Sequence, residues 1–329
     1  MASLSERSPE GKEQRAEGKG KNVPAAKPLL KWAGGKRQLL PALRRFYPAE
    51  FGAYFEPFLG SGAVFFDLHA RGLLNGHRAV LSDSNADLIA CYTTVRDHPD
   101  AVIAELSRLD RDHARKGSRH YYAIRDEQFN PQRRALAATA DGLPYTPSLA
   151  AMFIYLNRTG YNGLFRVNRR GLFNVPAGRH TSPRICDADN LRQLSAAFAR
   201  PRTALAVRDF DRALGDAGTG DFVYLDPPYA PVSRTAHFTS YTSERFGHHD
   251  QAQLQRTVIR LAERGVQVLL SNSFAPDISA LYAENSAARG AGLRARTVQA
   301  RRAINSRASA RGAVLEYLIT NIPKAAVVN

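Results

Sequence analysis

A planar amino group could be held and modified by four consecutive residues of this chain, Asp226, Pro227, Pro228 and Tyr229. They follow the apolar run 222–225, which is typical of a buried strand. A carboxylate and a proline-constrained backbone carbonyl can accept the two N–H groups of an amine, while an aromatic ring covers the flat heterocycle. The alternative is a proline-rich turn that only ends a strand. We interpret the tetrapeptide as a site for chemistry on a nucleobase.

A glycine turn and a carboxylate indicate where a nucleoside cofactor would bind. Gly60 and Gly62 follow a predicted strand, and Asp83 ends the next strand about twenty residues later. In doubly wound sheets such glycines let the backbone approach the ligand, and such a carboxylate accepts the ribose hydroxyls. The turn lacks the third glycine of the dinucleotide fingerprint, so S-adenosyl-L-methionine, which has a ribose and no pyrophosphate, fits best. For the glycines alone, a plain tight turn is the alternative.

The segment 31–36 precedes the first predicted helix and contains the only tryptophan of the sequence. The aromatic face of Trp32 and the ammonium group of Lys36 could hold the methionine end of this cofactor, with Lys36 near its carboxylate. The alternative is a buried tryptophan beside a helix cap.

The elements that must position these residues alternate between strand and helix patterns, which predicts an α/β fold with a mainly parallel sheet. We expect strands at residues 53–56, 78–81, 203–210, 222–225, 265–271, 297–300 and 314–320, the last two paired antiparallel. We expect helices from residue 36 to Pro48, at residues 63–70, around residues 88–92 and at residues 250–264.

An insertion splits this sheet. Residues 98–134 are charged and predicted to be helical, residues 141–147 form a loop, and residues 157–184 are rich in Arg, Asn and Gly. We therefore divide the chain into a split α/β domain, residues 27–92 and 192–324, and an inserted domain, residues 93–191. Residues 1–26 carry almost no large apolar groups, which predicts a disordered basic tail.

The charge of the chain predicts a polyanionic partner. The formal net charge is +16 over 329 residues. Residues 142–186 contain six arginines and no acid, and residues 285–315 contain seven arginines and no acid, including a predicted basic loop at 286–296. Arginine forks suit phosphate geometry, and binding through them weakens as salt rises. A solvated basic face is the alternative.

The remaining composition excludes several classes of protein. Cys91 and Cys186 cannot form a disulfide scaffold or a tetrahedral metal site on their own, and the nine histidines show no metal-ligand spacing. We therefore expect no metal and a reducing compartment. No apolar stretch reaches membrane-spanning length, and the beginning of the sequence lacks the apolar core of a signal peptide. We expect a cytoplasmic, nucleoid-associated protein that is a monomer in solution.

Eight motifs occur along the chain in a fixed order, namely residues 30–36, 55–62, Asp83, 157–166, 173–176, 226–231, 238–241 and 301–304. In type and order they resemble the Dam family of DNA adenine N6-methyltransferases, and the resemblance spans nearly all of residues 28–321. It implies a Rossmann-like sheet that binds S-adenosyl-L-methionine. It also implies that the insert is a target-recognition domain, mainly helical with a β-hairpin, that binds double-stranded DNA.

The resemblance implies methyl transfer to N6 of an adenine that is rotated out of the duplex, as a buried pocket requires. Asp226 and the Pro227 carbonyl would accept the N6 hydrogens, and Tyr229 would stack on the base, within the catalytic set Asp226, Pro227, Pro228 and Tyr229. We assign the cofactor site to Trp32, Lys36, Phe58, Gly60, Gly62, Asp83 and Asp226.

The resemblance also assigns residues to the DNA interface and supports GATC as the target. Lys31 would touch the outer base pair, Arg166 would read a guanine edge, and Tyr161 would wedge into the base stack. Asn162 would contact the base left unpaired, and Leu164 and Pro176 also match the family's pattern. Residues 141–147 and the basic loop 286–296 depart from that pattern and could alter the preference for flanking bases.

Three other functions stay open at this point. An amino methyltransferase that acts on RNA or protein could use the same tetrapeptide, although it would not need the recognition hairpin. Cytosine N4 is a chemically similar acceptor. A catalytically dead DNA-binding homologue is a further alternative, but it predicts damage to the cofactor or catalytic residues, all of which are present.

Overall fold

The computed structural model describes residues 26–32, 34–137, 145–229, 246–301 and 313–324. Part of the sequence predictions lies outside these residues: the basic tail before residue 26, most of the loop 141–147, and the motif residues 230–231, 238–241 and 302–304.

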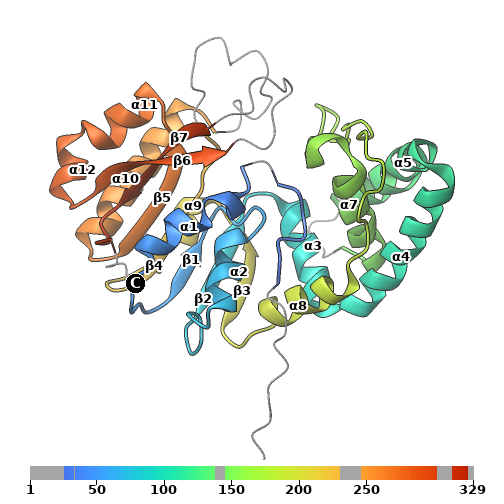
Figure 1. Cartoon of the computed structure of the whole chain (residues 1–329), viewed down its shortest axis with the longest axis horizontal. Helices are drawn as coiled ribbons and strands as arrows, with labels where there is room; N and C mark the ends of the chain where they lie inside the picture. Colours follow the sequence, from blue (N-terminus) through green and yellow to red (C-terminus); the bar gives the residue numbers. More distant parts are fainter. Residues whose placement is uncertain (1–25, 33, 138–144, 230–245, 302–312, 325–329) are drawn as a thin grey trace, which may run out of the picture.

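Seven strands form one sheet in the order β3-β2-β1-β4-β5-β7-β6 (Figure 1). They are β1 Tyr54–Glu56, β2 Ala79–Asp83, β3 Thr203–Val207, β4 Phe222–Leu225, β5 Gln267–Ser273, β6 Arg294–Arg301 and β7 Ala313–Thr320. Strands β1 to β5 pair in parallel, and β7 pairs antiparallel with both β5 and β6. The predicted α/β sheet, including its antiparallel last pair, is confirmed with bounds that differ by a few residues.

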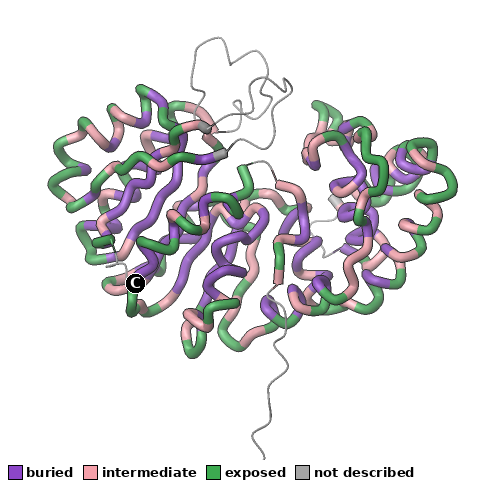
Figure 2. The backbone as a smooth tube through the Cα atoms, in the orientation of Figure 1, coloured by how far each residue is buried: buried purple, intermediate pink, exposed green. Residues whose placement is uncertain are grey.

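Alternate residues of the strands face two different helical layers. Tyr54 and Tyr224 belong to one hydrophobic cluster, and Phe55 and Val223 belong to the other. This alternation follows from the two-residue period of a strand. Figure 2 shows the central strands buried between helices whose outer faces are exposed. The sheet is therefore covered on both sides, as parallel sheets usually are.

The first predicted helix is wrong in its length. Residues 36–46 form three short turns, η1 Lys36–Gln38, α1 Leu40–Leu43 and η2 Arg44–Phe46. Pro41 lies at the beginning of α1 and cannot donate a backbone hydrogen bond to the preceding turn, which explains the break. The tight turn η1 buries Lys36 at the edge of the sheet, where an ordinary lysine would be exposed.

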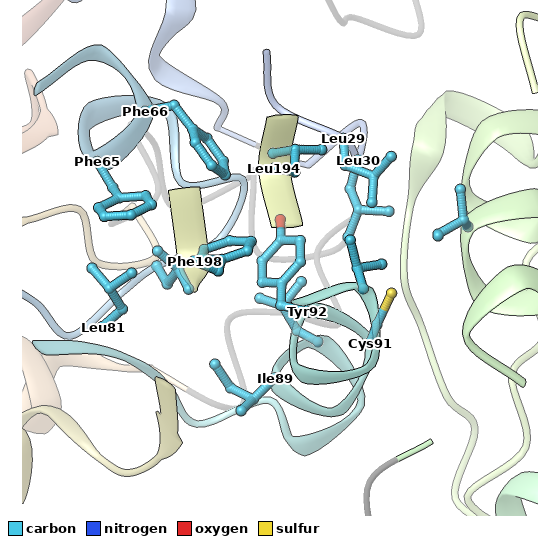
Figure 3. Packing of buried hydrophobic residues seen from close by; sticks show 14 of the residues in the cluster. Leu29, Leu30, Phe65, Phe66, Leu81, Ile89, Cys91, Tyr92, Leu194 and Phe198 are labelled. Atoms are coloured by element: carbon cyan, nitrogen blue, oxygen red, sulfur yellow. The ribbon is translucent and has the colours of Figure 1, made fainter. Parts of the chain in front are cut away.

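Helices α2, Ala63–Ala70, and α3, Ala86–Asp97, pack around an aromatic cluster. The ring of Phe198, at the end of α8 Ala188–Phe198, lies 5.1 Å from that of Tyr92 and 5.5 Å from that of Phe65 between ring centres (Figure 3). Buried aromatic pairs of this kind add to the free energy of burial. The cluster connects α2 and α3 through Phe198, and α2 begins directly after the glycine turn. The bounds of α2 are those that the sequence predicted.

The inserted segment is mainly helical, as expected. It contains α4 Pro99–Lys116, α5 Ser118–Ala123, the π-helical turn η3 Ile124–Phe129, α6 Asn130–Ala137 and α7 Pro147–Thr159. Helices α4, α5 and α7 gather on one side of the molecule (Figure 1). Their buried residues join the cluster that covers one face of the sheet. The division into domains stays a prediction.

Helix α7 was not predicted. Its residues Leu149 to Leu156 are all buried, so its sequence shows no polar stripe with a helical period. Thr146 caps it by accepting a hydrogen bond from the Leu149 amide at 3.2 Å.

The predicted hairpin has no regular strands. Residues 160–177 begin with the short turn η4, Tyr161–Gly163, and are held by two isolated antiparallel bridges, Gly160 with Ala177 and Val167 with Phe173. Asn162 and Gly163 have positive φ angles, which interrupt an extended strand at its start. The segment therefore folds back as a hairpin-like loop.

The second layer contains α9 Phe210–Ala213, α10 His248–Glu263, α11 Pro276–Ile278, the π-helical turn η6 Ser279–Ala283 and α12 Ser286–Gly290. The expectation of a loop over residues 286–296 is wrong at both ends. Asn285 caps α12 by accepting from the Ala288 amide, and β6 begins at Arg294. None of the described helices has the length and apolarity that a bilayer crossing requires.

Candidate active site

Three carboxyl groups lie at the carboxyl edge of the sheet. Asp83 ends β2, Glu56 ends β1 and Asp226 follows β4, with β1 between the other two strands. Two strand spacings separate the outer strands, about 10 Å. The charges of Asp226 and Asp83 both contribute to the raised pKa of Glu56, which is due mainly to burial. The edge therefore brings together the predicted cofactor carboxylate and the predicted catalytic carboxylate.

Asp226 is paired with Lys36. Lys36 Nζ lies 2.7 Å from Asp226 Oδ1, and the two side chains are 4% and 19% exposed. Ser271 Oγ on β5 donates to the same oxygen at 3.1 Å, and the Tyr224 hydroxyl lies 3.1 Å from Ser271 Oγ. Within the described parts of the chain no contact engages Oδ2. This oxygen is therefore available to a hydrogen-bond donor on a ligand.

The electrostatics of Asp226 combine two opposing effects. Burial raises its pKa, and the Lys36 ammonium group and the Ser271 hydroxyl hold the pKa down. Lys36 also donates to the Gly34 carbonyl, so two of its three N–H groups are used. The third could serve the carboxylate of a ligand.

Pro228 and Tyr229 of the tetrapeptide contact residues of three other elements. The Tyr229 hydroxyl donates to Glu316 Oε2 on β7 at 2.6 Å, and Lys36 Nζ lies 4.4 Å from the centre of the Tyr229 ring. Gln251 on α10 donates to the Pro228 carbonyl at 2.9 Å. Among the described residues no donor reaches the carbonyl of Pro227, which is the acceptor that the sequence predicts for the second N–H of an amine.

The glycine turn and Asp83 form the predicted constellation. The Gly60 amide donates to Asp83 Oδ2 at 3.0 Å, and the Asn85 amide donates to Oδ1 at 2.9 Å. Gly60 and Gly62 have φ angles of +46° and +67°, which favour glycine. The Tyr92 hydroxyl donates to the Gly60 carbonyl at 2.9 Å. Asp83 is thus oriented by backbone donors, and its remaining lone pairs can accept hydroxyl groups.

Trp32 lies against this turn, whereas the ring of Phe58 is turned to the other layer. A Cβ at Gly60 would approach Trp32 Cδ1 to 2.9 Å, so only glycine lets the indole lie there. Phe58 packs against Phe210 and Phe246, with ring centres 5.6 and 5.7 Å away. Its predicted contact with a cofactor stays a prediction.

Glu56 is a buried titratable group that the sequence did not single out. It is 2% exposed, and its Oε2 accepts from the Tyr54 hydroxyl at 2.8 Å and from the Phe65 amide at 3.1 Å. Burial raises the pKa of Glu56 to about 8. The group is therefore protonated in much of the population at neutral pH, which lowers the negative charge at the edge of the sheet.

Lys31 is fixed to the hairpin through Asn157. The Asn157 side chain accepts from the Lys31 amide at 2.8 Å and donates to the carbonyls of Lys31, at 2.9 Å, and Gly163, at 2.8 Å. Lys31 Nζ donates to the Arg158 carbonyl at 3.1 Å. Burial, followed by the nearby Arg158 charge, lowers the pKa of Lys31. One asparagine therefore sets the position of the hairpin relative to segment 31–36.

The other predicted DNA contacts lie on the hairpin. The Tyr161 side chain is 43% exposed, and the Tyr161 amide donates to the carbonyl of Pro176, itself an exposed residue. Arg166 Nε donates to Asn174 Oδ1 at 2.8 Å, which orients the guanidinium group. Asn162 and Leu164 are partly exposed on the same loop. The hairpin thus carries all the predicted contacts except Lys31, which lies against it.

A basic pocket of about 360 Å³ adjoins Lys31, and its walls include Arg158, Arg179, His180 and Arg184. Arg158 Nε is buried and has no hydrogen-bond partner among the described residues. Burial lowers the pKa of Arg158. A pocket with several cationic walls and an unpaired buried donor suits an anionic group.

Arg133 connects the cofactor side to the hairpin. Arg133 Nη2 donates to Asp87 Oδ2 at 2.7 Å and Nε to Oδ1 at 2.5 Å, and Nη1 donates to the Gly171 carbonyl. The guanidinium group lies 5.9 Å from the centre of the Phe165 ring, which in turn stacks on Trp32 at 6.4 Å. Asp87 follows Asp83 in the chain, so these contacts connect the predicted cofactor site with the hairpin that carries the predicted DNA contacts.

No cluster of three potential metal ligands occurs in the described residues.

Sequence reasoning missed three polar residues of the site, Gln251, Ser271 and Glu316, and gave no role to Asn157, which begins the motif 157–166. The three missed residues contact the tetrapeptide across 23, 45 and 87 residues of sequence, which a local pattern does not show. One signal was visible for Glu316, because it is the only acid in the apolar strand that ends the second arginine tract. An acid on a strand that packs into a core requires a partner.

Comparison with known proteins agrees with this geometry. Residues 32–297 match the D12 class N6 adenine-specific DNA methyltransferase family. The chain belongs to this family. The methyltransferase is 35% identical over 302 residues to the type II methyltransferase M1.LlaDCHI of Lactococcus lactis subsp. cremoris, which covers 92% of this chain and 97% of the relative.

Two further relatives match at similar levels. The type II methyltransferase M.MjaIII of Methanocaldococcus jannaschii is 37% identical, over 90% of this chain and 99% of the relative. A DNA adenine methylase of Vibrio cholerae is 36% identical, over 90% of this chain and 96% of the relative. The expected resemblance to the Dam family is confirmed, and the enzyme is a DNA adenine-N6 methyltransferase by family.

Proposed function

We propose that this methyltransferase transfers a methyl group from S-adenosyl-L-methionine to N6 of an adenine rotated out of double-stranded DNA, within the sequence GATC. The observation that carries the proposal is the position of Asp226. Its carboxylate lies beside an aromatic ring at the same sheet edge as Asp83 and the glycine turn.

The residues present fit the cofactor. Asp83 would accept the ribose hydroxyls, because backbone amides already orient both of its oxygens. Gly60 and Gly62 have positive φ angles, which favour glycine, so no side chain extends from these positions, and Trp32 adds an aromatic surface beside the turn. The third N–H of Lys36 would bind the cofactor carboxylate. When bound, the cofactor supplies a methyl group on a positively charged sulfur, which is a good leaving group.

The chain's contribution to the reaction is orientation and charge. Asp226 Oδ2 and the Pro227 carbonyl would accept the two N6 hydrogens, which increases the lone-pair character of the nitrogen. The Lys36 ammonium and the Ser271 hydroxyl favour the ionised form of Asp226 at neutral pH, against the effect of its burial. Tyr229 would stack on the adenine and fix the angle of attack.

Recognition would use the hairpin and the basic pocket. The amino group of a stacked adenine cannot reach a buried carboxylate, so the base must leave the duplex. Tyr161 is exposed and would wedge into the vacated stack, with Asn162 beside the unpaired base. Arg166, oriented by Asn174, would read a guanine edge. Lys31 would touch the outer base pair, and Leu164 and Pro176 would line the same surface.

The basic pocket next to Lys31 would take backbone phosphates, since phosphate contacts position a protein on DNA without reading its sequence. The recognition domain would then comprise residues 93–191, and the catalytic domain residues 27–92 and 192–324. Activity as a monomer and association with the nucleoid in the cytoplasm are part of the same proposal.

Product analysis tests the proposal directly. The purified protein is incubated with tritium-labelled S-adenosyl-L-methionine and duplexes that contain GATC, its permutation GTAC, or neither, and with RNA. We expect label only in the GATC duplex, as N6-methyladenine after nucleoside digestion. Label in N4-methylcytosine would overturn adenine as the acceptor base, and label in RNA would overturn double-stranded DNA as the substrate. Equal label in all duplexes would overturn GATC as the target sequence.

A further inference from the structure

Glu316 is the only acidic residue of β7, on a strand face that it shares with Val314, Leu318 and Thr320. It lies in β7 two residues before Leu318, which is fully buried in the cluster that also contains Tyr224. Because side chains alternate along a strand, Glu316 and Leu318 point to the same layer. A carboxylate in such a place costs free energy unless a donor satisfies it.

The donor is the hydroxyl group of Tyr229, 87 residues away in the chain. The Tyr229 oxygen lies 2.6 Å from Glu316 Oε2. This distance is in the range of hydrogen bonds from a hydroxyl to an ionised carboxylate, which are stronger than neutral ones. A tyrosine side chain held at its hydroxyl end cannot swing away about the Cα–Cβ bond, so the hydrogen bond fixes where the ring lies.

The sheet fixes Glu316 relative to the catalytic tetrapeptide. Glu316 pairs with Ser273 of β5 in the antiparallel ladder, and Ser271, two residues earlier on β5, donates to Asp226. Strand β5 in turn pairs with β4, which leads into the tetrapeptide. The position of the carboxylate is therefore determined by backbone hydrogen bonds and not by a flexible loop.

The placement carries an electrostatic cost. The charge of Glu316 contributes to the raised pKa of Asp226 and of Tyr229, although burial is the main cause for both. An apolar residue at this position would avoid that cost. A residue that only filled the core would not need to be acidic.

We infer that Glu316 is a positioning residue for base stacking: through the Tyr229 hydroxyl it holds the aromatic ring in the position at which an extruded purine stacks beside Asp226. The inference rests on the proposed role of Tyr229 as the stacking surface. It adds a residue from the antiparallel end of the sheet to the site.

The test compares Glu316→Ala, Glu316→Gln, Tyr229→Phe and the double variant Glu316→Ala with Tyr229→Phe. Glu316→Ala should lower kcat by about ten- to a hundredfold, the range set by a hydrogen bond to a charged group. Glu316→Gln keeps an acceptor oxygen and should retain kcat within about threefold. The double variant should be no slower than the slower single variant, because both changes remove the same bond.

A spectroscopic readout separates positioning from stability. With 2-aminopurine in place of the target adenine, a loosely held ring quenches the extruded base less, so the complex of Glu316→Ala should be brighter than that of the wild type. Glu263→Ala, which removes an exposed acid from α10, should match the wild type in both readouts.

Three results would overturn the inference: wild-type kcat and fluorescence in Glu316→Ala, additive losses in the double variant, or a folded Glu316→Gln as slow as Glu316→Ala. If Glu316→Ala does not fold, Tyr229→Phe takes its place, and its kcat and fluorescence are compared with those of Glu316→Gln in the same way. If the wild type methylates a base other than adenine, the proposed function fails, but the ratio of variant to wild-type turnover on that base still tests Glu316.

Discussion

Lys36 Nζ and Asp226 Oδ1 are 2.7 Å apart, which joins the segment before the first helix to the residue that follows β4. The sequence predicted a role for each residue but not their contact. The ammonium group is the largest influence that opposes the rise in the pKa of Asp226 on burial. Under the proposed function, one lysine would serve both the cofactor carboxylate and the ionised form of Asp226.

Replacement of Lys36 should shift the pH dependence of the reaction. In Lys36→Met the pKa of Asp226 rises further, because burial then acts without the ammonium group. Under the proposed function the ionised carboxylate is the active form, so kcat/KM should fall more at low pH than at high pH, and the acidic limb of the profile should move to higher pH. Lys324→Met, an exposed lysine after β7, should keep the wild-type profile. A Lys36→Met profile that is lower but unshifted would contradict this coupling.

Glu56 should make the stability of the protein depend on pH. Its pKa is raised from 4.5 to about 8, so the neutral form is favoured in the folded state. The contribution of Glu56 to the free energy of unfolding is fully present below pH 4.5 and is lost as the pH rises to about 8. The loss is about 1.4 kcal/mol per unit of pKa shift, which is a few kcal/mol in all.

Glu56→Gln keeps an acceptor for Tyr54 and Phe65 but cannot ionise. Urea unfolding at about pH 5 and pH 8 should therefore show the variant gaining stability relative to the wild type as the pH rises. A constant difference between the two proteins across this range would show that Glu56 does not titrate there.

Much of the α/β framework follows from the sequence. Strand β4 and helix α2 have the predicted bounds, because an apolar run before Asp226 and a glycine turn before Ala63 are local signals. The sequence of helix α7 gave no such signal, because a helix that is buried on all sides has no polar stripe with a helical period.

The site itself was only partly predictable for a related reason. Asp83 and Gly60 lie where the doubly wound pattern places them, and this needs only their sequence spacing. Glu316 and Asn157 act through partners 87 and 126 residues away, so their roles depend on sheet order and on the docking of the hairpin. These tertiary relationships are not encoded in any single segment.

Arg166 should determine one base pair of the target. In Arg166→Ala, discrimination at that position should relax by about 1–3 kcal/mol in competition binding to single-substitution duplexes. Arg169→Ala provides the matched control, because Arg169 is an exposed arginine on the same hairpin. It should weaken binding equally for all duplexes and reduce the salt dependence. Uniform weakening in Arg166→Ala would make Arg166 a phosphate contact.

Gly163 should be the most sensitive glycine of the hairpin. A Cβ there would overlap with Cβ of Lys31 and come within 3.0 Å of its carbonyl, at a φ of +62°. Gly163→Ala should cost about 2–5 kcal/mol of stability and weaken DNA binding, because Lys31 must move. At Gly171, φ is +72° but the space is open, so Gly171→Ala should cost only about 1–2 kcal/mol. Equal melting temperatures for the two variants would mean that the Lys31 contact is unimportant.

Single-turnover methylation by Asp226→Ala tests the central claim most directly. The rate on a GATC duplex should fall by at least about a thousandfold, since the acceptor of the target amine is lost. The dissociation constant for the duplex should stay within about tenfold, because the proposed DNA contacts lie on the hairpin and in the basic pocket. Asp216→Ala, an exposed acid, should leave both unchanged. A folded Asp226→Ala enzyme with a rate near that of the wild type would contradict the account.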